Sequence, residues 1–138
     1  MVDDDVVLVQ VEAVPRTSTG SARVRVRSDV GTAVVFWAGA SEEVGGEHHV
    51  EWSIDEDVSW GSNTWPAAVP AFGLWENGGQ LVFRGRLSFT ADGGATLEFA
   101  SALILLDLAT PGPPEVVSGT GAEVQVPQSS VSLYPYLL

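Results

Sequence analysis

The chain of 138 residues contains no cysteine and no lysine. The lack of cysteine excludes disulfides, thiolate nucleophiles and cysteine-ligated zinc or iron–sulfur sites. The lack of lysine, together with the absence of a Gly-x-Ser-x-Gly elbow, argues against nucleophilic catalysis. No glycine-rich phosphate loop precedes a helical pattern. We therefore expect a protein that is not an enzyme and that carries no cofactor.

Long hydrophobic runs are also missing. The longest is about half of what a membrane-spanning helix needs. The segment from Met1 to Asp5 is acidic where a secretory signal is basic. We expect no contact with a membrane, no export by that route, and a location in the cytoplasm or in a virion.

Positive charge is scarce, since eighteen acidic residues face six basic ones and the net charge is −12. This balance opposes binding to nucleic acid or to an anionic membrane. Five of the six arginines recur at alternate positions and so fall on single faces of two predicted strands: Arg23, Arg25 and Arg27, then Arg84 and Arg86. These faces are either the solvated sides of strands or a contact surface for an acidic partner, such as Asp3 to Asp5 of a neighbouring copy.

What the sequence does contain is alternating hydrophobicity broken by turn residues. Hairpin signals stand at Asn77-Gly78-Gly79 and at Asp92-Gly93-Gly94. No helical pattern or repeat is found. The sequence predicts one all-β domain over residues 1–138, an antiparallel β-sandwich or jelly roll with a closed β-barrel as the alternative, of about nine or ten strands. The predicted strands cover residues 7–13, 21–28, 32–38, 48–54, 80–90, 97–108, 115–118, 122–126 and 131–136.

The stretch from Leu97 to Leu108 is the most apolar of these strands. No charged residue lies between Glu98 and Asp107. Because both alternating faces are apolar, the pattern predicts a central strand that is covered on both sides.

One group of residues resembles a metal or acid–base site: His49, Glu51, Asp55 and Asp57. On a strand His49 and Glu51 point the same way, which suits a metal pair or a general base with its orienting partner. The neighbouring His48 points to the opposite face. Asp55 and Asp57 begin a spacing like that of a calcium loop, but the required glycine and glutamate are missing. These four residues are weak candidates, and we expect no bound metal.

Three of the five tryptophans, Trp60, Trp65 and Trp75, lie in the irregular segment 55–75. If they are exposed, their large rigid rings suit stacking against sugars or another small ligand. If they are buried, they close one end of the core.

The C-terminus ends in Tyr136, Leu137 and Leu138, and the last eight residues carry no charged side chain. An apolar terminus of this kind is expected to dock, either in its own core or against another subunit.

Three functions follow, in order of preference. The first is a structural protein that self-associates or decorates a larger particle, such as a phage capsid or tail. The second is a carbohydrate-binding or small-ligand-binding module that uses segment 55–75. The third is a small barrel enzyme with a histidine–carboxylate site. The ranking rests on the apolar terminus, the arginine faces and the few catalytic groups, because fold does not determine function.

Overall fold

The computed structural model describes residues 6–14, 23–40, 44–99, 102–109, 112–114 and 119–135. These residues form eleven strands and one short 3-10 turn, Gln128–Ser130. The strands are β1 (Val6–Ala13), β2 (Arg23–Ser28), β3 (Gly31–Trp37), β4 (Glu47–Ile54), β5 (Thr64–Pro66), β6 (Gly73–Asn77), β7 (Gln80–Phe89), β8 (Ala95–Phe99), β9 (Ala102–Leu106), β10 (Thr120–Pro127) and β11 (Val131–Pro135).

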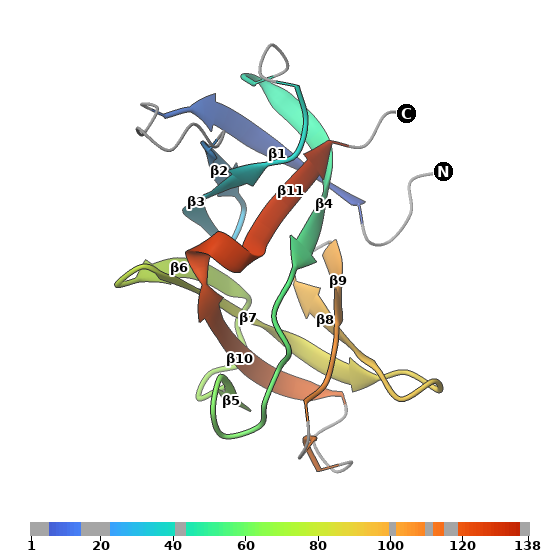
Figure 1. Cartoon of the computed structure of the whole chain (residues 1–138). Helices are drawn as coiled ribbons and strands as arrows, with labels where there is room; N and C mark the ends of the chain where they lie inside the picture. The colour runs from blue at the N-terminus through green and yellow to red at the C-terminus, as the bar shows by residue number, and fades with distance from the viewer. Residues whose placement is uncertain are drawn as a thin grey trace.

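Five strands close into a barrel in the order β1, β2, β3, β11, β4, with β4 pairing back to β1. The barrel that the sequence offered as an alternative is thus confirmed. All its pairs are antiparallel except β3 with β11, where Ser132 lies opposite Phe36. The alternate valines of these strands point inward and are fully buried, among them Val11, Val24 and Val50. Figure 1 shows this barrel in its upper half.

The segment between β4 and β11 builds a second sheet, seen in the lower half of Figure 1. Strand β10 pairs with β7 from Gln80 to Leu87 on one side, and β5 pairs with the far edge of β10. On the other side of β7, β6 occupies the first half as far as Arg84 and β8 begins at Arg86. Gly85 therefore marks the point where β7 changes partners.

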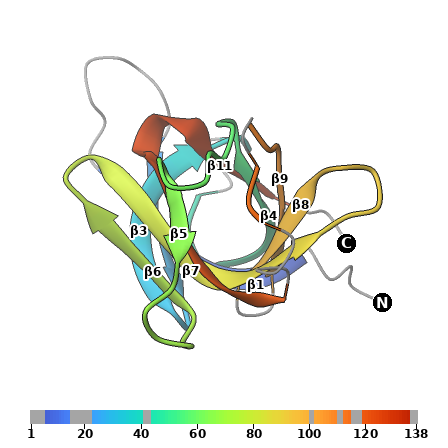
Figure 2. The ribbon, with the colours of Figure 1, turned by 90° about the horizontal axis from the view of Figure 1, so that it is seen from below.

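The barrel and the second sheet share one hydrophobic core. The two parts meet where Gly31 of β3 bridges to Leu74 of β6. The ring of Trp52 in β4 makes edge-to-face contacts with Phe83 and Phe99, at centroid distances of 5.5 and 5.8 Å. In Figure 2 the strands are seen to curve around a closed ring.

The prediction of one central strand over residues 97–108 was wrong. This stretch supplies two antiparallel strands, β8 and β9, with Phe99 opposite Ala102. Strand β9 is covered on only one face, so that Ile104 is buried while Leu105 is 66% exposed. No Gly, Pro, Asn or Asp stands between Phe99 and Ala102 in the sequence to signal a reversal, and an apolar run alone does not distinguish one strand from two.

Other details also differ from the sequence prediction. The barrel and the second sheet are hydrogen-bonded into one continuous sheet of eleven described strands, and its pairing is mixed rather than antiparallel throughout. Two of them, β5 and β6, start within the segment expected to be irregular. The predicted strand 115–118 lies outside the described residues. Within the described part of the chain, no helix is long and apolar enough to cross a membrane.

Candidate functional site

The three tryptophans of segment 55–75 are placed in two different environments. Trp60 packs against the hydrophobic core, as the plug interpretation expects. Trp65 in β5 is 37% exposed, and Trp75 in β6 is partly exposed. Because Trp65 lies opposite Glu123 and Trp75 lies opposite Val82, both belong to the outward face of the second sheet.

An arginine and a glutamate lie between these two indoles. Arg84 of β7 is opposite Glu123 of β10 in the register, and its Nε donates a hydrogen bond to Glu123 Oε2 over 2.9 Å. The two side chains are only 22% and 26% exposed. The Arg84 guanidinium carbon also lies 4.7 Å from the centre of the Trp75 ring, a cation–π contact. We call Trp65, Glu123, Arg84 and Trp75 the tryptophan face.

A glycine and three amide side chains complete this surface. A Cβ on Gly73 would lie 2.9 Å from Trp75 Cζ3, so the glycine leaves room for the indole. Beside the indole, Gln125 Nε2 donates to Gln80 Oε1 over 2.6 Å, and Asn77 Nδ2 lies 3.5 Å from Gln125 Oε1. Hydrogen-bonding groups therefore border the aromatic rings.

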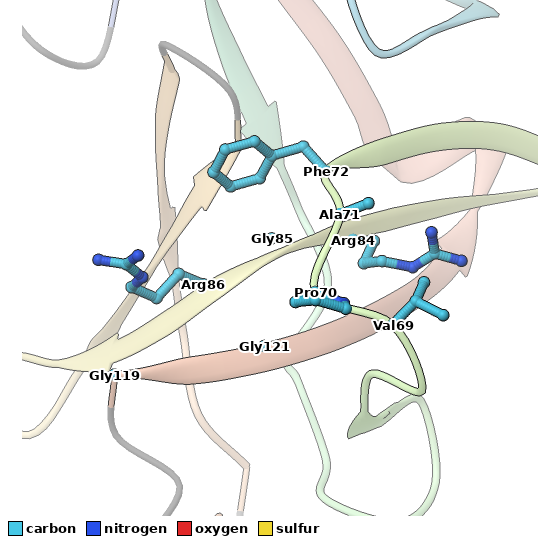
Figure 3. Close-up of a pocket in the computed structure, with 9 residues that line it drawn as sticks. All are labelled: Val69, Pro70, Ala71, Phe72, Arg84, Gly85, Arg86, Gly119 and Gly121. Atoms are coloured by element: carbon cyan, nitrogen blue, oxygen red, sulfur yellow. The ribbon is translucent and has the colours of Figure 1, made fainter.

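Residues 67–72, which we call the strap, cross the outward face from β5 to β6. The Ala67 N–H donates to the Gly121 carbonyl over 3.1 Å. A cavity of about 210 Å³ lies between the strap and the strands, and its lining includes Gly85, Gly119 and Gly121. Figure 3 shows Arg86 and the exposed Phe72 ring on one side of the strap, and Arg84 and the exposed Val69 on the other.

The first arginine face, on β2, makes contacts within its own molecule. Arg27 Nε lies 3.2 Å from Glu12 Oε1, Arg25 is opposite Glu12 in the register, and Arg23 lies 5.3 Å from the centre of the Phe36 ring. Such exposed contacts are typical of a solvated strand face and contribute little stability. β3 and β6 separate this face from Arg84 and Arg86.

The histidine–carboxylate candidates are not brought together. His48 turns inward, where its ring lies 5.3 Å from that of Trp37. His49 and Glu51 point outward from β4, while Asp55 and Asp57 are exposed beyond its end. Among the described residues no group of three His, Asp or Glu side chains is placed to hold a metal. The interface candidates Tyr136, Leu137 and Leu138 lie outside the described residues.

Sequence reasoning missed Glu123, Phe72 and the glycines beneath the strap. The one available signal was Gly85, an isolated glycine inside a strand pattern, which often marks a close approach of another backbone. Glu123 gave no signal because its pairing with Arg84 depends on the register of β10 with β7. Comparisons with protein-family models, with curated proteins and with solved structures found no match.

Proposed function

We propose that the chain is a carbohydrate-binding module and that the tryptophan face is its binding surface. The observation that carries the proposal is the placement of a hydrogen-bonded Arg84–Glu123 pair between two partly exposed indoles. Indoles offer large rigid areas for stacking on the apolar faces of sugar rings. Arginine donates and glutamate accepts hydrogen bonds, and sugar hydroxyls need both.

The arginine of this face is held in place before any ligand arrives. Glu123 accepts a hydrogen bond from its Nε, and its guanidinium carbon lies over the Trp75 ring. The remaining guanidinium donors are thereby fixed in direction. Binding then loses less side-chain entropy than it would with a freely rotating arginine, which favours affinity.

The width of the face indicates a ligand longer than one sugar. Trp65 lies on β5 and Trp75 on β6, with β10 and β7 between them. Three strand spacings of about 4.8 Å separate the outer strands by roughly 14 Å. An oligosaccharide that lies across the strands reaches both indoles, whereas a single ring contacts one.

The test is a glycan array followed by titration calorimetry with the oligosaccharides that bind. We expect Trp65→Ala and Trp75→Ala each to weaken binding about five- to tenfold, since each removes a stacking contact of about 1–1.5 kcal/mol. Tyr134→Ala is the matched control, because Tyr134 is an exposed aromatic residue on β11 of the barrel. Silence across neutral and acidic glycans, or binding unaffected by Trp65→Ala, would contradict the proposal.

Assembly remains a second candidate because of three other exposed apolar residues. Leu8 of β1 and Tyr134 of β11 lie on the strands that flank β4, opposite His49 and Glu51 respectively. Leu105 is exposed on β9, which touches β4. Large exposed apolar side chains that gather on one side of a molecule are typical of protein–protein contact surfaces. Neither candidate function requires a catalytic group.

A further inference from the structure

The strap cavity contains an open position beside Arg86. Outward residues of β7 face a side chain on β10 at the neighbouring positions, where Val82 is opposite Gln125 and Arg84 is opposite Glu123. Arg86 is opposite Gly121, which has no side chain. The space that a cross-strand side chain would fill is part of the cavity beneath the strap.

Arg86 also differs from Arg84 in how its charge is balanced. Its Nε lies 3.9 Å from Glu98 Oε1, too far for a hydrogen bond, and the two side chains are 60% and 43% exposed. The guanidinium donors of Arg86 are therefore available to a ligand. In Figure 3 the Phe72 ring lies on the same side of the strap as Arg86, so that an apolar surface and a cation border one opening.

We infer that this opening is a subsite for an acidic group, a carboxylate or a sulfate, carried by the bound oligosaccharide. This inference rests on the proposed function, because the cavity adjoins the tryptophan face through Arg84. Arginine pairs with such oxyanions through two parallel hydrogen bonds. A cavity of about 210 Å³ admits one substituent rather than a whole ligand. Because the net charge of the chain is −12, most of its surface repels an acidic ligand, and binding is favoured only where arginines lie.

The test compares ligands that differ only in charge. Oligogalacturonate is titrated against its methyl ester of equal length, and a sulfated oligosaccharide against its desulfated form. We expect the protein to bind at least one acidic form about tenfold more tightly than its neutral counterpart, the value of one charge-assisted interaction. Arg86→Gln should abolish this preference.

A second variant tests the cavity without changing any charge. A Cβ on Gly121 would lie 3.4 Å from Ala67 Cβ, an ordinary contact, so Gly121→Ala should fold and narrow the subsite. Gly112→Ala is the control, because nothing lies within 4 Å of a Cβ there. Equal binding of charged and neutral ligands would overturn the subsite, and so would a preference for the acidic ligand that survives Arg86→Gln. In either case, binding that depends on Trp65 would still support the proposed function. Absence of binding to every member of both pairs overturns the subsite, and the glycan array then decides the proposed function separately.

Discussion

At the scale of single residues, one glycine permits the contact between the barrel and the second sheet. Gly31 has a φ of +151°, and a Cβ there would lie 1.9 Å from the carbonyl oxygen of Leu74. The Leu74 N–H donates to the Val30 carbonyl over 3.0 Å, which fixes β6 against the start of β3. Asp29 and Val30 form the turn that precedes β3. The requirement for glycine arises from Leu74, which is distant in the sequence.

We therefore expect Gly31→Ala to lower the free energy of unfolding by about 2–4 kcal/mol, through backbone strain and overpacking. Denaturant unfolding measures this change. Gly112→Ala is again the control, since a methyl group there meets no atom within 4 Å. A Gly31→Ala protein as stable as the control would show that β3 and β6 do not approach so closely in solution.

A second residue-scale prediction concerns the turn between β7 and β8. The Thr90 hydroxyl and the Gly94 N–H both donate hydrogen bonds to Asp92 Oδ1, and these hold the pKa of the Asp92 carboxyl below its ordinary value. Since the folded-state pKa is depressed, the associated stability is present above about pH 4 and is lost as the pH falls through the folded-state pKa.

Titration of the carboxyl carbon of Asp92 by NMR gives this pKa directly. We expect a value below that of a model peptide, and a return towards the peptide value in Thr90→Val, because the hydroxyl donor is the larger cause of the shift. An unshifted pKa in the unmodified protein would contradict the turn geometry.

At the scale of elements, three aromatic rings link β4 of the barrel to β7 and β8. Trp52, Phe83 and Phe99 contact one another edge to face, and all three are buried. The indole Nε1–H of Trp52 has no hydrogen-bond acceptor among the described residues. Replacing Trp52 with phenylalanine therefore removes a buried donor that lacks an acceptor. Replacing Phe83 with alanine, by contrast, only leaves a cavity.

We expect Phe83→Ala to destabilise the protein by about 3–5 kcal/mol and Trp52→Phe by much less, on the order of 1 kcal/mol. Thermal and denaturant unfolding of the two variants provide the comparison. Equal losses would indicate that the Trp52 indole N–H makes a favourable contact in solution.

At the scale of the whole molecule, the assembly hypothesis makes a prediction about mass. If the face that carries Leu8, Leu105 and Tyr134 joins copies of the chain, light scattering should give a mass above that of one chain at high concentration. Leu105→Glu should restore the mass of one chain without loss of fold, because the side chain is 66% exposed. Leu103 is the other outward residue of β9 and is less exposed than Leu105. The mass of a Leu103→Ser variant, measured in the same way, tests whether the contact surface extends to this position. The mass of one chain at every concentration and salt level would remove this candidate.

The sequence by itself determined the fold class and most strand positions. Alternation of apolar with polar residues is local, so it identified β1, β2, β4 and β7 to within about two residues. The glycine pair Gly78-Gly79 likewise gave the hairpin between β6 and β7, since both residues adopt positive φ. Only the tertiary structure decided which strands are neighbours. The closure of β11 onto β3, the reversal within residues 97–108, and the meeting of Trp65, Glu123, Arg84 and Trp75 depend on long-range register, and register is set by the shared core rather than by any short stretch of sequence.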